Sequence, residues 1–291
     1  MPEKQNPSKP ALAPASVVIA CYSDLDIFER NLAAFARQTH RDFELIVADD
    51  GSPQPYGPLL EKWAPRFSRP IQHVRHDDIG FRKTRILNRA VLVSRFDRLI
   101  FIDQDCLPHH HFVRDHLAHS VPGAVLAARR AHVRREDVPA PEEIFARGLG
   151  LGPLRLLSLR LRGRAALIEH GLPLPFPYEI AYRGILGSNF SISKADFVKI
   201  NGFNAAYAGP GWEDTDIDFR LRLVGIRIRT LRHVAVEYHV DHPVRVINDL
   251  LNQERLQAVK TNRVVRAPVG LEEIREGDFE RHEYGRAAMA K

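Results

Sequence analysis

The chain has 291 residues, with 42 basic and 36 acidic side chains and a formal net charge of +6 at pH 7. Hydrophobic residues make up 44% and charged residues 27%, as in an ordinary globular protein. No apolar run reaches the length of a membrane span, and the modest basic excess fits phosphate-bearing ligands, an anionic membrane surface or nucleic acid without choosing among them.

The first residues and the two cysteines indicate the compartment. Residues 1–15 are rich in proline and polar side chains and lack the apolar core of a signal peptide, so we expect a disordered leader. Cys21 and Cys106 each follow a predicted strand, which favours a reduced, cytoplasmic chain over a disulfide scaffold.

Residues 16–122 alternate short apolar runs with segments of helical spacing. We expect strands at 16–20, 43–48, 71–74 and 98–102. We expect helices at 24–38, 59–67 and 83–93. This alternation predicts an α/β fold with a Rossmann-like, mostly parallel central sheet flanked by helices.

The second half of the chain has weaker periodicity. Strand-like runs lie at 124–131, 184–193, 226–230 and 234–238. Helical spacing is found at 194–200 and 216–224, and the polar tail, residues 244–291, is expected to be a helical extension.

Residues 149–168 interleave leucine with Arg155, Arg160, Arg162 and Arg164. Such a pattern is typical of a basic amphipathic element at a membrane surface. It also fits a packed helix with solvated arginines, and the sequence leaves both interpretations open.

The most informative stretch is the apolar run 99–102, which ends in Asp103-Gln104-Asp105. Carboxylates at the carboxyl end of a strand lie where α/β proteins bind ligands, and residues i and i+2 of an extended chain point the same way. Carboxylate oxygens suit hard divalent cations, which usually bridge to phosphates. The pair therefore predicts a metal–diphosphate site, although an Asp-x-Asp after a strand is also a common loop.

Five segments together resemble the family-2 glycosyltransferases of the GT-A fold, over about residues 16–243. They are 17–22, Asp49-Asp50-Gly51-Ser52, 76–82 with Arg85 and Asn88, Asp103-Gln104-Asp105, and Gly211-Trp212-Glu213-Asp214 followed by Tyr238-His239. The third and fifth look most like bacterial chondroitin-type polymerases and animal β-1,4-galactosyltransferases. The resemblance implies a nucleotide-binding half at 16–122 and an acceptor-binding, catalytic half at 123–243 of one domain.

The resemblance implies a uracil and ribose site. Tyr22 would lie against the base, and Asp50, with Asp49 beside it, would accept a hydrogen bond from the ring N–H. Asp78 is a candidate for the base or ribose. Asn88 matches a family asparagine, but Leu87 stands where the family has arginine, so Arg85 or Arg89 would substitute for it.

The metal and diphosphate site is implied in the same way. Asp105 would ligate the metal directly, and Asp103 would bind ribose hydroxyls or reach the metal through water. His239 matches a late histidine ligand of the related galactosyltransferases, with His242 as its rival. Imidazole with carboxylate favours Mn²⁺ over Mg²⁺.

The catalytic residues follow from the fifth segment. Asp214 matches the base that takes the proton of the acceptor hydroxyl, and Glu213 would help to hold a sugar. Trp212 would offer an apolar platform, although the related loops usually have glycine there. Gly187 and Asn189 match a segment whose backbone and amide approach the donor sugar.

The resemblance thus implies an inverting, metal-dependent transferase that moves a hexose or N-acetylhexosamine, such as galactose or N-acetylgalactosamine, from a UDP-sugar. The acceptor would be a growing surface polysaccharide or a lipid-linked glycan of a bacterium, with 149–168 near the inner membrane face.

Three alternative functions stand beside this one. A sugar-phosphate nucleotidyltransferase needs a glycine-rich basic loop after the first strand, and residues 21–26 do not provide one. A non-catalytic nucleotide- or glycan-binding module would not need both Asp pairs and Glu213-Asp214. A nucleic-acid partner is not expected, because no aromatic-basic stripe is present.

Overall fold

The computed structural model describes residues 12–167, 171–242, 250–275 and 277–285. Four parallel strands form its first half in the order β3-β2-β1-β4: β1 (Ala15–Cys21), β2 (Phe43–Asp49), β3 (Ile71–Arg75) and β4 (Arg98–Asp103). Every residue of β1 and β2 is buried, as expected for a parallel sheet covered on both faces. These strands fall where the sequence predicts them.

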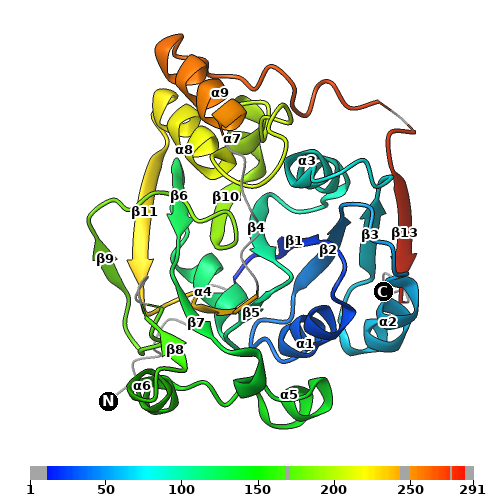
Figure 1. Ribbon diagram of the computed structural model, residues 1–291, viewed down its shortest axis with the longest axis vertical. Coiled ribbons are helices and arrows are strands. Elements are labelled where there is room, and N and C mark those ends of the chain that lie inside the picture. The colour runs from blue at the N-terminus through cyan, green and yellow to red at the C-terminus, as the bar shows by residue number, and fades with distance from the viewer. Residues whose placement is uncertain (1–11, 168–170, 243–249, 276, 286–291) are drawn as a thin grey trace, which may run out of the picture.

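Helices cover both faces of this sheet (Figure 1). The connecting helices are α1 (Leu25–Phe35), α2 (Gly57–Trp63) with the 3₁₀ turn η1 (Ala64–Arg66), and α3 (Lys83–Val93). Alternate residues of β1 belong to two different apolar clusters: Val17 and Ile19 pack with α1 and α2, and Val18 packs with α3. The mixed α/β fold with a mostly parallel central sheet is confirmed.

The central sheet continues with strands from the second half of the chain. Its nine-stranded order is β13-β3-β2-β1-β4-β10-β6-β11-β9. The added strands are β6 (Ala124–Ala127), β9 (Tyr178–Ile180), β10 (Phe190–Ser193) and β11 (Arg227–Arg232). The strand β10 pairs antiparallel with both β4 and β6. The second half of the chain is therefore hydrogen-bonded directly to β4, the strand that ends at Asp103.

A second, four-stranded sheet has the order β5-β12-β7-β8. Its strands are β5 (Cys106–Pro108), β7 (Arg130–Val133), β8 (Ala165–Ala166) and β12 (Glu237–Val240). The prediction of one strand over 124–131 is therefore wrong, because the chain leaves the central sheet after Ala127 and enters the second sheet at Arg130. The strand predicted at 234–238 begins only at Glu237, since His233 and Ala235 have positive φ.

The remaining helices lie around these sheets. They are α4 (Phe112–Ala118), the 3₁₀ turn η2 (Arg135–Asp137), α5 (Pro141–Arg147), α6 (Pro153–Leu161), α7 (Lys194–Lys199) and α8 (Glu213–Leu223). None of the helices in the described ranges is both long and apolar enough to cross a bilayer.

The two ends of the chain depart from the sequence predictions. Residues 1–11 of the expected leader lie outside the described residues, but Leu12 packs against the core and Ala15 is the buried first residue of β1. The tail forms α9 (Leu250–Thr261), as expected, and then β13 (Glu280–Tyr284), which pairs antiparallel with β3. A wholly helical tail is therefore a wrong prediction.

Candidate active site

The end of β4 places Asp103 and Asp105 at the junction of the two sheets. Gln104 between them turns inward: its amide nitrogen donates to the Tyr22 carbonyl at 2.9 Å, and its Oε1 accepts from the Tyr56 hydroxyl at 2.8 Å. This anchor lies between the two aspartates and holds the turn against the end of β1.

Asp105 lies beside two imidazoles. Its Oδ2 is 3.2 Å from His242 Nε2 and 3.8 Å from His239 Nε2. The pairing of β12 with β5 sets His239 opposite Cys106, and Val240 donates to the Asp105 carbonyl at 2.9 Å. Burial alone would raise the pKa of Asp105, but His242 and His239 hold it at about 2.

These three residues have the donor chemistry of a divalent metal site. Their ligand atoms lie within 4.8 Å of one another, and Nδ1 of His239 is buried with no hydrogen-bond partner among the described residues. A second group, His132, His239 and Asp241, adjoins the first and shares His239. One carboxylate with two imidazoles suits Mn²⁺ better than Mg²⁺.

Asp103 is engaged by a lysine. Lys83 Nζ, from the first turn of α3, lies 2.6 Å from Oδ1 and 2.8 Å from Oδ2 of Asp103. Burial would lower the pKa of Lys83, but the negative charges of Asp103, Asp214 and Glu213 outweigh it and raise that pKa above its ordinary value. The ammonium is therefore a cation held among carboxylates from β4 and α8.

Asp214 lies in the first turn of α8 against a glycine. The Gly187 N–H donates to Asp214 Oδ2 at 2.9 Å. A Cβ on Gly187 would lie 2.8 Å from the carboxyl carbon of Asp214, so only glycine lets the carboxylate approach this closely. Burial, followed by the charge of Glu213, raises the pKa of Asp214 to about 7.

The adjacent residues Glu213 and Asp214 form an acidic pair, and each has one carboxylate oxygen without a hydrogen bond to any residue that the structure describes. Oδ1 of Asp214 and Oε2 of Glu213 are both buried without a partner in the described part of the chain. Buried polar atoms are nearly always paired in proteins. Two such oxygens on adjacent residues can accept hydrogen bonds from a ligand bound beside α8.

Glu237 links β12, the strand that carries His239, to the segment that holds Asp214. It is fully buried on β12, two residues before His239, and its Oε1 accepts from the Ser188 hydroxyl at 2.7 Å. Ser188 follows Gly187, whose N–H holds Asp214. The second oxygen of Glu237 is buried without a partner among the described residues.

Asp50 and Asp49, which were expected to bind the uracil base, are hydrogen-bonded to other groups of the protein. Asp50 Oδ1 lies 2.6 Å from His76 Nε2, and its Oδ2 accepts from the backbone N–H of Arg82 at 2.8 Å. Asp49 is buried against His73 and the N–H of Ser52. Both carboxylates are thus used within the fold.

Tyr22 and Asp78 meet at the rim of the same end of the sheet. The Tyr22 hydroxyl donates to Asp78 Oδ2 at 3.1 Å, and Asp78 is exposed. Gly51 makes this arrangement possible, because a Cβ there would lie 2.6 Å from the Asp78 Cα. This pair offers the more accessible polar surface for a base or ribose.

Two of the expected donor-binding residues use their side chains within the fold, and a third lines a separate pocket. The Asn88 amide is buried and bonds both the N–H and the carbonyl of Phe203. The Asn189 amide is buried between His116 and the Ala235 carbonyl. Arg85 lines a small pocket with Glu273 and Asp278, on the side of α3 away from Lys83.

Trp212 precedes α8 in a left-handed conformation, with φ of 71°. Its carbonyl accepts from the Asp216 N–H at 2.9 Å, which starts the helix that carries Glu213 and Asp214. The backbone of Trp212 therefore positions the acidic pair.

The sequence predicts no role for Glu237, His132 or Asp241. The signal for Glu237 was present, since residues 237 and 239 share one face of a strand.

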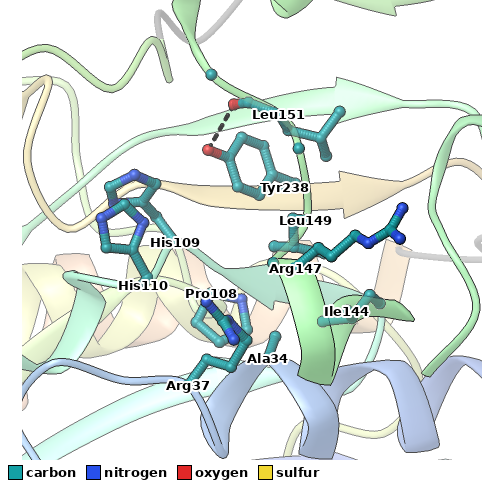
Figure 2. A pocket seen from close by; sticks show the side chains of 13 residues that line it. Ala34, Arg37, Pro108, His109, His110, Ile144, Arg147, Leu149, Leu151 and Tyr238 are labelled. Carbon is teal, nitrogen blue, oxygen red and sulfur yellow. Dashed lines mark hydrogen bonds between the residues drawn. The ribbon is translucent and has the colours of Figure 1, made fainter. Parts of the chain in front are cut away.

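A cavity of about 320 Å³ lies apart from these groups, on the other face of β12 (Figure 2). Tyr238, whose hydroxyl donates to the Leu151 carbonyl at 2.8 Å, forms one wall. Because neighbouring residues of a strand face opposite ways, this cavity and the side chain of His239 lie on opposite sides of the second sheet.

Comparison with known proteins bears on the family and the fold of the chain. The family model described as glycosyl transferase family 2 matches residues 16–165, and a model described as the N-terminal domain of galactosyltransferase matches residues 174–243. The fold resembles that of S. aureus TarS, with a TM-score of 0.60 and 15% sequence identity, over 89% of this chain and 41% of that one.

Several curated proteins are similar in sequence. Validoxylamine A glucosyltransferase of Streptomyces hygroscopicus subsp. jinggangensis is 27% identical over 257 residues, which cover 82% of this chain and 59% of that protein. The Escherichia coli chondroitin synthase is 27% identical over 78% of this chain and 35% of its own length. Human β-1,4-galactosyltransferase 2 is 34% identical over 80 residues, 24% of this chain and 22% of that protein. The chain thus spans only part of each relative.

Proposed function

Because the chain belongs to glycosyl transferase family 2, we propose that it transfers a hexose or N-acetylhexosamine from a UDP-sugar to a hydroxyl of a glycan or lipid-linked acceptor, with inversion. The observation that carries this proposal is the buried Asp214 carboxylate, fixed by the Gly187 N–H, with one oxygen unbonded. A carboxylate of this kind is suited to accept a proton from an acceptor hydroxyl.

The proposed reaction is a single displacement. Asp214 takes the proton from the acceptor hydroxyl as its oxygen bonds to the anomeric carbon, and the bond from that carbon to the UDP oxygen breaks on the opposite face. UDP leaves with the electron pair of that bond. Glu213, next to Asp214, would orient a sugar hydroxyl through its unbonded oxygen.

Charge on the leaving diphosphate must be neutralised at the same end of the sheet. Lys83 brings a permanent cation to this point, held by Asp103. Asp105 and His239, with His242 as the alternative to His239, would hold Mn²⁺ or Mg²⁺. When bound, such an ion neutralises phosphate charge.

Tyr22 and Asp78 are proposed to contact the base and ribose, with Asp50 and Asp49 supporting the loop beneath them. The amides of Asn88 and Asn189 bond other parts of the fold, and Arg85 lines a separate pocket, so these three residues would act on the donor only indirectly. Gly187 would let the donor sugar approach the backbone, with Trp212 beside the sugars.

The biological setting is also a proposal. Relatives are named chondroitin synthase and β-1,4-galactosyltransferase, so a polysaccharide or glycan acceptor and a galactose-type donor are the first to test. We propose a bacterial surface polysaccharide pathway and a cytoplasmic location with peripheral contact at the inner membrane face, through residues 149–168.

The decisive experiment is donor hydrolysis by the full chain with a panel of UDP- and GDP-sugars, with and without Mn²⁺. We expect slow, metal-dependent hydrolysis of one UDP-sugar, and D214N is expected to bind that donor but not to transfer its sugar. Absence of both turnover and metal-dependent binding with every donor would instead favour a non-catalytic binding module.

A further inference from the structure

The helix α6 presents an apolar ridge to solvent. Leu154, Leu157 and Leu161 are 84%, 43% and 89% exposed. They are spaced i, i+3 and i+7 and therefore lie along one side of the helix. Leu156 and Leu159 point the opposite way and are buried in the core, so the helix is anchored and the ridge is not part of that packing.

Arginines flank this ridge. Arg155, Arg160 and Arg162 are exposed, and residues 149–167 contain no acidic side chain. Arg164 is held by Asp137 at 2.9 Å, and Arg155 lies 3.8 Å from the same aspartate. Arg160 and Arg162 therefore add positive charge beside the leucines, as in helices that lie in a membrane interface.

A cavity adjoins the start of α6, since Gly152, the residue before the helix, lines it. Its rim carries Arg37 and Arg147, and its wall includes the glycine-rich stretch 148–152 that leads into the helix (Figure 2). Arg37 donates to the Phe145 carbonyl at 2.7 Å, which fixes its guanidinium at the rim. Two arginines at a cavity of about 320 Å³ suit a phosphate-bearing headgroup.

We propose that the ridge Leu154–Leu157–Leu161, its flanking arginines and this cavity form a docking surface for an anionic membrane. The leucines would enter the interface, the arginine stems would lie along it, and the cavity would receive an acidic lipid headgroup. A second copy of the chain would not match as well, because two surfaces rich in arginine repel each other.

The position of the surface relates it to the proposed reaction. The helix α6 is followed by β8, which pairs with β7 at His132 and Val133. The strand β8 therefore lies between the proposed membrane contact on α6 and His132 of β7. If the proposed function holds, a lipid-linked acceptor would be presented near the metal site, but vesicle binding itself does not depend on catalysis.

The test is co-sedimentation of the full chain with vesicles of phosphatidylcholine alone or of phosphatidylcholine mixed with phosphatidylglycerol. We expect binding to the anionic vesicles only, weakened by salt. The variant Leu154→Ser/Leu157→Ser/Leu161→Ser should lose binding at least tenfold. Its matched control is Leu250→Ser/Leu251→Ser, on α9, where both leucines are 65% exposed.

The charge is tested separately by Arg160→Gln/Arg162→Gln. We expect roughly thirty-fold weaker binding to anionic vesicles, since each arginine near an anionic surface contributes about a factor of five. The control Arg227→Gln/Arg263→Gln removes the same charge elsewhere. Donor hydrolysis, measured without vesicles, should be unchanged in all four variants.

Three results would overturn the proposal. The wild-type chain could stay in the supernatant with anionic vesicles, or the α6 variants could sediment as the wild type does. The leucine variant could also convert a dimer to a monomer in light scattering without vesicle binding, which would assign the ridge to a second copy of the chain.

Discussion

Replacing Gly187 with alanine tests the position of the proposed base most directly. The backbone at Gly187 is not in the positive-φ region, so alanine is tolerated by the local conformation and only the added methyl group matters. That Cβ would lie 2.8 Å from Cγ and 2.9 Å from Oδ2 of Asp214, and closer still to Oδ1. Ordinary carbon–oxygen contacts are several tenths of an ångström longer, so the carboxylate must shift by about 1 Å.

Such a shift has a predictable effect on rate. It lengthens the 2.9 Å hydrogen bond from the Gly187 N–H and moves the oxygen that would accept the proton. A displacement of about 1 Å in a catalytic group lowers rate on the order of 100-fold. Overpacking of this kind destabilises by about 1–3 kcal/mol, a decrease of several degrees in Tm.

The assay compares G187A with G152A. Gly152 also lies outside the positive-φ region, and a Cβ there meets nothing within 4 Å, so G152A should match the wild type. Turnover of the donor identified in the hydrolysis panel gives kcat, calorimetry gives the affinity for UDP, and thermal unfolding gives Tm. We expect G187A to lose turnover while it keeps UDP affinity. Near-normal turnover in a folded G187A protein would refute the reasoning that Asp214 must sit against residue 187.

Three further predictions address the metal, the pH dependence and the lysine. D105A should abolish Mn²⁺-dependent UDP binding in calorimetry, and whichever of H239A and H242A weakens it more identifies the imidazole ligand; binding unaffected by D105A would remove Asp105 from the site. Since the pKa of Asp214 is raised to about 7 and a base must be ionised, kcat/KM should rise about tenfold per pH unit below pH 7 and level off above it; a rate that falls over that range would contradict the assignment. K83M removes a cation that lowers the pKa of Asp214, so its pH profile should shift to higher pH with weaker donor affinity, and K83R should restore both; an unshifted profile would exclude this coupling.

The sequence predicts the first half of the fold well because its strands are continuous apolar runs buried on both faces. The prediction from sequence fails where contacts between distant segments determine the secondary structure. The run 124–131 reads as one strand, but its chain crosses between two sheets after Ala127. The segment Glu280–Tyr284 has almost no apolar side chain, since it lies at the sheet edge in largely exposed surroundings, and so it gives no strand signal.

The candidate site, like the fold, could be predicted from the sequence only in part. The positions of Asp103, Asp105, Asp214 and His239 follow from motifs at the ends of predicted elements, and the structure brings Asp105 beside His239. The phase of α3 relative to the sheet is not visible in the sequence. Lys83 faces Asp103, whereas Arg85 lies on the other side of the helix. Asn88 likewise bonds the backbone of a segment more than a hundred residues away.

The strand β13 also has a consequence for how this protein is handled. It pairs with β3 and forms the outer edge of the central sheet with mostly charged, exposed residues (Figure 1). An uncovered edge carries a row of unsatisfied amide and carbonyl groups that can recruit another chain. Shortening the protein before residue 280 would therefore expose the edge of β3 and favour aggregation even though the candidate catalytic groups remain.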